Sequence, residues 1–481
     1  MQDLFDNNDM TGLAEAIRRG DVSAKEVLEF SLDRLDERNP AVNAVISERR
    51  EEARNEVSGG LPEGPLHGVP FVIKDLGMDV AGLPSTNGSR LFADAVAEKD
   101  STLVERYREA GLVVIAKTNT PEFGKNASTE PALFGPTRNP YALDRSPGGS
   151  SGGTAVAVAV GIVPGGHASD GGGSIRIPAS ACGLVGLKPS RGRTPTAPAR
   201  TLFSSPMSVH HALTRSVRDT ALLLDLSAGP TVGDPYVILA PKRPYVDEVG
   251  ADPGRVRIGL SNALPDGTPV DPECAAVTTS VAGLLEELGH DVTEGAPNFP
   301  LDALTAGLSV LMGIPMTIEV DERLEVLNRA IRDDDLEPMA RMIYDRAKSE
   351  SATNVVKALQ ELERAAQVIG AFFVDHDLLL TPTMARPAAP LGLLDTANPM
   401  SIWEHSAGYS GLTSPFNSSG QPAISLPMGH DSAGVPIGVQ LVGAFGREDL
   451  LIQVASQLET ARPWSIAPVW PPVPVWPPVP A

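Results

Sequence analysis

Two loops rich in glycine and serine, with a short apolar run between them, constrain this chain more than any other feature. Ten of its 46 glycines fall between Gly148 and Gly173, and the run 155–163 between the loops contains only Ala, Val, Gly and Ile. Glycine at this density indicates backbone that approaches another group closely, because no Cβ obstructs it. With 42% hydrophobic and 21% charged residues, the chain can bury a large core. These glycines therefore belong to a folded structure and not to a disordered one.

Strand and helix patterns alternate along the chain, which predicts an α/β fold with a largely parallel sheet. The run 69–73 is almost unbroken in apolar residues, and an amphipathic helix at 101–110 leads into another apolar strand at 113–116. Further helices are expected at 275–290 and 354–369, and late strands at 377–382 and 436–443. Periodicity alone does not assign the run 155–163 to helix or strand.

The last residues contain VWPPVP twice, at 469–474 and 475–480. Such a proline-rich segment favours polyproline II. We expect residues 1–467 to form one domain and residues 468–481 to form a solvated tail without a catalytic role. A docking segment for a partner is the alternative.

Charge and cysteine content exclude several classes of function. The net charge is −21, and the clustered Lys and Arg that nucleic-acid phosphates or an anionic membrane require are missing. Cys182 and Cys274 are too few for a disulfide framework and lack the spacing of a zinc site. The N-terminus is acidic and polar, unlike a signal peptide, and no run of about 18 apolar residues occurs. We therefore expect a cytoplasmic protein that binds neither nucleic acid nor membrane.

The glycine-rich loops do not have the spacing of a nucleotide site. G-x-x-x-x-G-K-[ST] is absent from the chain, and the segment from Gly148 to Gly173 contains no G-x-G-x-x-G. Ser174 instead follows three glycines, and backbone N–H groups in such a loop can bind the oxygen of a tetrahedral intermediate beside an attacking hydroxyl. Ser174 is therefore a candidate nucleophile. The alternative is a tight strand-to-helix turn with no chemical role.

A serine nucleophile needs a base, and the eight histidines are scattered, with only His167 near the serines in sequence. A lysine can serve if burial lowers its pKa, since desolvation disfavours the ammonium form. Lys74 ends the apolar strand and is placed for this role. The alternative is a lysine that reaches solvent or pairs with Asp75.

Several ordered motifs together resemble the amidase signature family, and the resemblance covers most of the chain. The motifs are GVPFVIKDL, TNTPEFG, NPYALDRSPGGSSGGTAVAVAVG, SDGGGSIRIPASACGLVGLKPSRGR, LLLTPT and SPFNSSGQPAISLPMG. The resemblance implies a single large α/β domain, with its core motif region at 68–193. It further implies a mixed, mostly parallel sheet covered by helices on both faces, and a buried helix at 155–163.

The resemblance also implies a catalytic triad of Lys74, Ser150 and Ser174, with a cis peptide bond between Gly149 and Ser150. Ser174 would attack an amide carbonyl and form an acyl-enzyme, with protons relayed through Ser150 to neutral Lys74. No metal or organic cofactor has a role in this chemistry.

Three further groups are expected around the triad. The N–H groups of Gly171, Gly172, Gly173 and Ser174 would form the oxyanion hole. Ser151 is expected to hydrogen-bond the lysine or the oxyanion loop. Asp170 and Arg176 are expected to brace that loop, although a purely structural role serves equally well for all three side chains. Cys182 is expected to be a packed core thiol.

Two enzyme alternatives remain open at this point. Gly149 to Gly153 also satisfies G-x-S-x-G, which would make Ser151 the nucleophile of an α/β-hydrolase, but this leaves Lys74 and the second loop unexplained. The glutaminase subunit of tRNA-dependent amidotransferases has the same triad. A scaffold of this fold that has lost catalysis is the non-enzymatic alternative.

The sequence after KPSRGR looks more like free-standing amidases of the aryl-acylamidase and 6-aminohexanoate-cyclic-dimer-hydrolase types. We therefore expect an amidase that cleaves the C–N bond of small linear amides, anilides or oligoamides, with esters and carbamates as further substrates. The pocket is expected at 125–129, 310–316 and 402–409, whose low charge favours neutral, apolar or aromatic groups. A monomer or a homodimer is expected.

Overall fold

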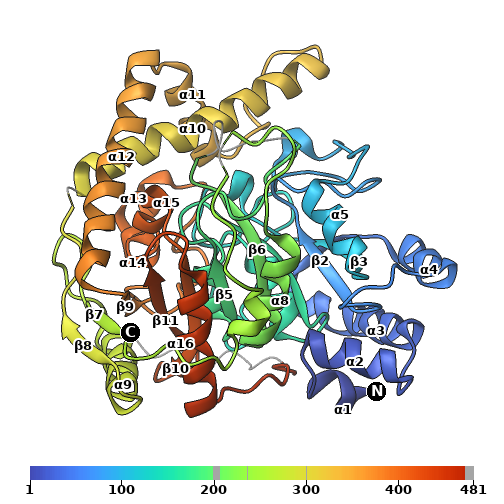
Figure 1. The fold of residues 1–481 in the computed structure, drawn as a ribbon. Coiled ribbons are helices and arrows are strands. Elements are labelled where there is room, and N and C mark those ends of the chain that lie inside the picture. The colour runs from blue at the N-terminus through green and yellow to red at the C-terminus, as the bar shows by residue number, and fades with distance from the viewer. Residues whose placement is uncertain (199–205, 236, 300, 472–481) are drawn as a thin grey trace.

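An 11-stranded mixed sheet runs through the protein (Figure 1). The computed structural model describes residues 1–198, 206–235, 237–299 and 301–471. In spatial order the strands are β1 (Val45–Glu48), β3 (Val113–Thr118), β2 (Pro70–Lys74), β4 (Gly165–Asp170), β6 (Val209–Thr214), β5 (Val185–Lys188), β10 (Ala423–His430), β11 (Pro436–Gly443), β9 (Leu378–Pro382), β7 (Arg257–Leu260) and β8 (Asp291–Glu294). The strands expected near 69–73, 113–116, 377–382 and 436–443 are β2, β3, β9 and β11.

The fold class is confirmed as α/β with a mixed sheet, but parallel pairing is less common than predicted. Parallel pairs are β2–β3, β2–β4, β7–β8 and β7–β9. The other six pairs, which include every pair formed by β5, β6 and β10, are antiparallel. Two parallel regions are thus joined by an antiparallel centre. Alternation of strands and helices along the chain predicts parallel neighbours. The strands β10 and β11, however, follow each other directly as one hairpin and therefore pair antiparallel.

Helices cover both faces of the sheet. Side chains alternate across a strand: Leu378 and Leu380 of β9 pack in the cluster that includes α9 and α16, whereas Leu379 packs with α12. The helices are α1 (Gln2–Asp6), α2 (Met10–Arg19), α3 (Ala24–Val42), α4 (Arg50–Gly59), α5 (Thr102–Glu109), α6 (Gly152–Ala159), α7 (Arg176–Ala181), α8 (Val217–Ser227), α9 (Pro272–Glu287), α10 (Leu301–Val326), α11 (Pro338–Lys348), α12 (Ala352–Asp375), α13 (Pro399–His405), α14 (Ala407–Ser410), α15 (Pro415–Ser419) and α16 (Glu448–Ala461), with short 3-10 turns η1 (Arg90–Phe92), η2 (Glu122–Gly124) and η3 (Tyr245–Glu248).

The buried helix predicted at 155–163 is α6, which is displaced toward the N-terminus: it spans Gly152–Ala159, every one of its residues is buried, and 160–163 lie beyond its end. Helix α3 packs across its C-terminal end. Ser31 Oγ donates to the carbonyl oxygen of Ile162 (2.6 Å), Arg34 Nη1 donates to that of Gly161 (3.0 Å), and Arg38 donates to that of Val160. Two guanidinium groups thus satisfy the carbonyl end of α6, where the helix dipole favours positive charge.

The described start of the expected tail packs against the domain. Val469 N–H donates to the carbonyl oxygen of Ala159 (2.9 Å), and the guanidinium of Arg38 lies 5.2 Å from the centre of the Trp470 ring. Trp470 Nε1 donates to Glu37 (3.1 Å). Most of the repeated hexapeptide, residues 472–481, lies outside the described residues. The division at residue 467 stays a prediction.

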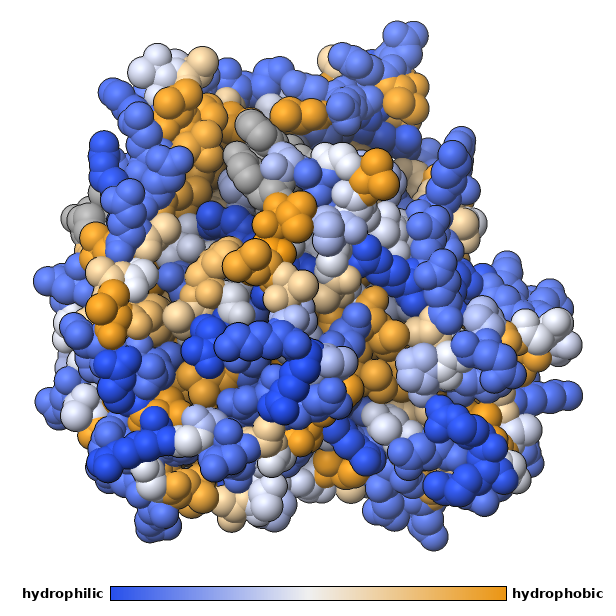
Figure 2. All heavy atoms as spheres, in the orientation of Figure 1, coloured by the Kyte–Doolittle hydropathy of each residue, from blue (hydrophilic) through white to orange (hydrophobic). Residues whose placement is uncertain are grey.

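Helices α10, α11 and α12 lie together at the top of Figure 1, away from the N-terminal helices. Among the described residues, one segment, Leu304–Val326 of α10, is long and apolar enough by length and composition to cross a membrane. This segment contributes side chains to the main cavity, described below, and α10 packs against α11 and α12. Polar and charged side chains cover most of the face shown in Figure 2, with smaller apolar groups between them.

Candidate active site

Lys74 lies at the carboxyl end of β2 and is fully buried. Its Nζ is 2.7 Å from Ser150 Oγ and 3.0 Å from Ser169 Oγ, and both contacts are hydrogen bonds. Burial lowers the pKa of Lys74 to about 7, although the negative charge of Asp170 acts in the opposite direction. Close to neutral pH, Lys74 can therefore lose its proton and accept one from a neighbouring hydroxyl.

Asp75 does not pair with Lys74, so the alternative in which the two form an ion pair is excluded. Asp75 forms an ion pair of 2.7 Å with Lys117 of β3 and accepts hydrogen bonds from Thr86. Successive side chains of a strand point to opposite faces. In the part of the chain that the structure describes, both hydrogen-bond partners of Lys74 Nζ are serine hydroxyls.

Ser150 follows a cis peptide bond from Gly149 and directly precedes the first turn of α6. Its side chain is 1% exposed. The turn η2 lies against it: a Cβ added to Gly124 would be 3.0 Å from Ser150 Oγ and 2.5 Å from Leu76 Cδ2. Gly124 also has a φ of +65°, so glycine suits this position both by space and by backbone conformation.

Ser174 lies in the loop between β4 and α7. Hydrogen bonds to the carboxylate of Asp170 hold that loop in place. Asp170 accepts from Arg176 Nε and Nη2 (2.9 Å each) and from Asn417 Nδ2 (2.9 Å). Burial alone would raise the pKa of Asp170, but the ion pair with Arg176 outweighs it and holds this pKa well below its usual range. Both side chains are fully buried, and the lowered pKa of Asp170 keeps it a carboxylate that binds Arg176 and fixes the loop.

The oxyanion loop differs from the prediction at Gly173. The Gly173 N–H donates a hydrogen bond to Asp170 Oδ1 (2.7 Å), so it is not free to bind an oxyanion. A Cβ at Gly173 would also be 2.3 Å from Thr413 Oγ1. Within the described part of the chain, no group accepts from the N–H groups of Gly171, Gly172 or Ser174. These three N–H groups remain as candidate oxyanion donors.

Within the described residues, the Ser151 hydroxyl hydrogen-bonds neither Lys74 nor the loop 171–174, contrary to the prediction. Its Oγ donates to the carbonyl oxygen of Ser169 (3.3 Å) and accepts from Ser169 N–H (3.4 Å). Ser169 is the partner of Lys74 that sequence reasoning missed. No sequence signal indicated this contact, because it arises from the pairing of β2 with β4, two parallel strands whose carboxyl ends meet at one edge of the sheet.

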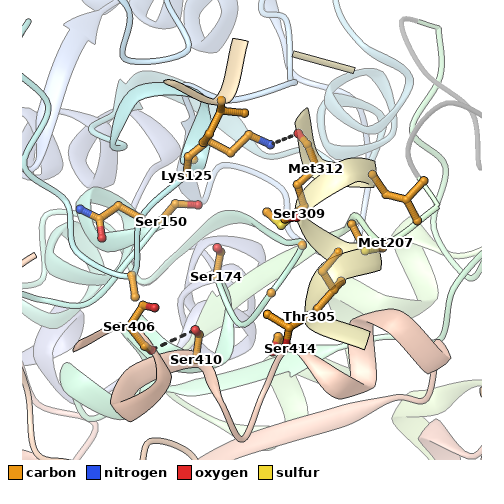
Figure 3. A pocket seen from close by; sticks show the side chains of 18 of the residues that line it. Lys125, Ser150, Ser174, Met207, Thr305, Ser309, Met312, Ser406, Ser410 and Ser414 are labelled. Carbon is orange, nitrogen blue, oxygen red and sulfur yellow. Dashed lines mark hydrogen bonds between the residues drawn. The ribbon is translucent and has the colours of Figure 1, made fainter. Parts of the chain in front are cut away.

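A cavity of about 490 Å³ opens above these residues, and both Ser150 and Ser174 line it. In Figure 3 their hydroxyl groups point into the same part of the cavity, with α10 across from them. All three segments expected to form the pocket contribute to it, through residues such as Lys125, Met312 and Trp403. Lys125 Nζ donates to the carbonyl oxygen of Met312 (2.7 Å) and so spans the cavity wall. Helix α11 is a further wall that the sequence did not indicate.

Comparison with known proteins assigns the chain to a family. The family model described as Amidase matches residues 26–452. The chain belongs to the amidase family. Members of this family with similar sequences include the 6-aminohexanoate-cyclic-dimer hydrolase of Paenarthrobacter ureafaciens, 40% identical over 95% of both chains. The acylamidase of Rhodococcus erythropolis is 35% identical, also over 95% of both chains.

Solved amidase structures have the same fold. A 6-aminohexanoate cyclic dimer hydrolase superposes with a TM-score of 0.91 at 38% identity, covering 97% of this chain and 99% of that one. A bacterial aryl acylamidase of the amidase signature enzymes gives 0.87 at 28% identity, over 96% and 97%. The amidase family assignment and the predicted resemblance therefore agree, and the chain is an enzyme that acts on amides.

Proposed function

We propose that this amidase hydrolyses the C–N bond of small carboxylic amides through Lys74, Ser150 and Ser174, by way of an acyl-enzyme. One observation carries the proposal: a fully buried lysine with a pKa of about 7 is hydrogen-bonded to Ser150 on the floor of the cavity that Ser174 also lines. The α/β-hydrolase alternative has less support, because Ser151 is fully buried and bonds the Ser169 backbone.

The reaction begins when neutral Lys74 takes a proton from Ser150 while Ser150 takes one from Ser174. Ser174 Oγ then attacks the carbonyl carbon, and the N–H groups of Gly171, Gly172 and Ser174 stabilise the oxyanion. Collapse of this intermediate breaks the C–N bond, and the relay returns the proton to the departing amine. Water then attacks the acyl-enzyme through the same relay, which releases the acid and restores Ser174.

The relatives and the cavity narrow the substrate. Two relatives are named as hydrolases of a cyclic amide dimer and of acylamides. A neighbouring structure of a tRNA-dependent glutaminase subunit is less similar, with a TM-score of 0.75 at 25% identity. We therefore propose anilides and oligoamides as substrates in preference to glutamine.

Three serine variants test the mechanism with matched chemistry. Ser174→Ala should lower kcat for an anilide by about 10⁴-fold or more, because the group that forms the acyl-enzyme is lost. Ser150→Ala should lower kcat by about 10³-fold, whereas its neighbour variant Ser151→Ala should cost less than about tenfold. Thermal unfolding would verify that each variant is folded. Unchanged turnover in Ser174→Ala, or a severe loss confined to Ser151→Ala, would overturn the assignment.

A chemical test locates the intermediate. An activated ester of a short acid should add its acyl mass to the peptide that contains Ser174, detected by mass spectrometry after acid quenching. The same label should be missing from Ser174→Ala. A label on another residue would show that Ser174 is not the nucleophile.

A further inference from the structure

Methionine is concentrated around the catalytic cavity. Of the 11 methionines in the chain, five line it: Met207, Met312, Met316, Met339 and Met342. They come from three separate parts of the chain, namely the segment before β6, helix α10 and helix α11. The proposed proton relay does not use these side chains, so the presence of five methionines around the cavity needs another explanation.

Four of the methionines form two apolar walls of the cavity, one on each of two neighbouring helices. Met312 and Met316 are four residues apart on α10, and Met339 and Met342 are three apart on α11, so each pair shares one face of its helix. Helices α10 and α11 pack against each other. In Figure 3, Met207 and Met312 lie across the cavity from Ser150. Exposure increases from Met316, which is 2% exposed, to Met342, which is 36% exposed, so the walls extend from the interior to the surface.

Methionine differs from leucine in a way that matters for a binding wall. Its side chain is unbranched, has three rotatable bonds, and places a polarisable sulfur at the edge of aromatic rings. A wall of leucines holds one shape, whereas a wall of methionines repacks around different shapes at small cost. Leu308, Leu311 and Ile343 are among the other apolar residues that line the cavity on these two helices.

We propose that the five methionines make the cavity an adaptable apolar site, which accepts amides with aromatic and with aliphatic substituents of differing shape. This inference rests on the proposed amide hydrolysis and names its substrate class. Of the charged side chains that line the cavity, Arg346 on α11 is 47% exposed and pairs with Glu350 (3.8 Å), and Lys125 is bound to the carbonyl oxygen of Met312 (2.7 Å).

Substrate profiles of leucine variants test the inference. The double variants Met312→Leu/Met316→Leu and Met339→Leu/Met342→Leu conserve volume but stiffen the walls. With acetanilide, hexananilide, benzanilide and N-hexylacetamide, each double variant should widen the spread of kcat/KM values by about tenfold or more relative to the unmodified protein. Met428→Leu, a buried methionine of β10 outside the cavity, is the matched control and should leave the spread unaltered. The inference would be overturned if, in both double variants, the spread of kcat/KM values stays within about threefold of the spread in the unmodified protein.

Oxidation footprinting provides a test that needs no methionine variant. Peroxide converts a methionine thioether to the sulfoxide and is itself reduced to water. In the Ser174→Ala protein, saturating hexananilide or benzanilide should each slow oxidation of Met342 by about fivefold or more, measured by peptide mass spectrometry. Met400 is 71% exposed and does not line the cavity, so it should oxidise at the same rate with and without amide.

The two tests separate failure of the inference from failure of the proposed function. If Met342 is protected by only one of the two amides, or by neither, the adaptable site is refuted while the serine mechanism stands. If the Ser174→Ala protein consumes the amides during footprinting, the proposed mechanism itself is refuted.

Discussion

Two buried lysines of this amidase have a pKa lowered to about 7 but different hydrogen-bond partners. Lys74 ends β2 and Lys188 ends β5, and both are at most 1% exposed. Burial lowers the pKa of each to about 7, and for each the charge of Asp170 opposes the shift. Lys74 Nζ bonds two serine hydroxyls, those of Ser150 and Ser169, and both serines line the cavity, whereas Lys188 Nζ donates to the carbonyl oxygen of Pro189 (2.9 Å). A carbonyl has no proton to give, so a lowered pKa alone does not make a catalytic base.

The sharpest test of this comparison removes each lysine in turn. Lys74→Ala should lower kcat by about 10³-fold or more, because no other group can accept the proton of Ser150. Lys188→Met should alter kcat by less than about threefold, since Lys188 contacts no group of the relay. Steady-state hydrolysis of an anilide measures both. Equal losses in the two variants would mean that the lysines act together.

The pH dependence of the reaction identifies which lysine titrates. Lys74 must be neutral to act as base, so kcat/KM should increase with pH and level off above about 7, falling by about tenfold per unit well below that. The midpoint should be the same in Lys188→Met. A midpoint that shifts in that variant would assign the titration to Lys188 instead.

Ser169 offers a smaller perturbation of the catalytic lysine. Ser169→Ala removes the 3.0 Å hydrogen bond to Lys74 Nζ without touching Ser150. We expect kcat to fall by about tenfold and the midpoint of the pH profile to move, because Lys74 loses one of its two partners. Ser169→Thr keeps the hydroxyl and should restore both values. A loss of activity with an unchanged midpoint would indicate that Ser169 acts only on packing.

The stability of Lys188→Met should show the cost of burying the second lysine. A lysine whose pKa is about 7 when folded and 10.5 when unfolded binds fewer protons in the folded state between these values. The contribution of Lys188 to the free energy of unfolding is therefore lowest at and below pH 7 and increases toward pH 10. Lys188→Met should increase the free energy of unfolding by about 1–4 kcal/mol at pH 7, and by less at pH 10. Denaturant unfolding at the two pH values measures this, and an increase independent of pH would contradict the explanation.

The sequence predicted the parts of the site that are encoded locally. Lys74 ends an apolar strand and Ser174 follows three glycines, so local pattern indicated both, whereas Ser150 was indicated by the resemblance to the amidase signature family. The role of these residues in the reaction stays a prediction until the variants are measured. The three pocket segments were also predicted from that resemblance, and their low charge indicated neutral substrates.

Features that depend on contacts between distant segments were not predictable. The Gly173 N–H donates a hydrogen bond to Asp170. Asp170 also accepts from Asn417, which lies 247 residues away in the sequence. The bond from Ser169 to Lys74 depends on which strands are neighbours. The antiparallel centre of the sheet arises because β10 pairs with β5, and the sequence pattern of each strand is the same in either direction.

Helix α6 joins the two serines that precede it to segments far apart in the sequence. Ser150 and Ser151 directly precede its first turn, while residues near its last turn are held by Arg34 and Arg38 of α3 and by Val469. Glu37 and Trp470, which are 433 residues apart, form a hydrogen bond beside this junction. Because Val469 follows all 11 strands of the described sheet in the sequence, the junction can close only after every one of these strands has left the ribosome.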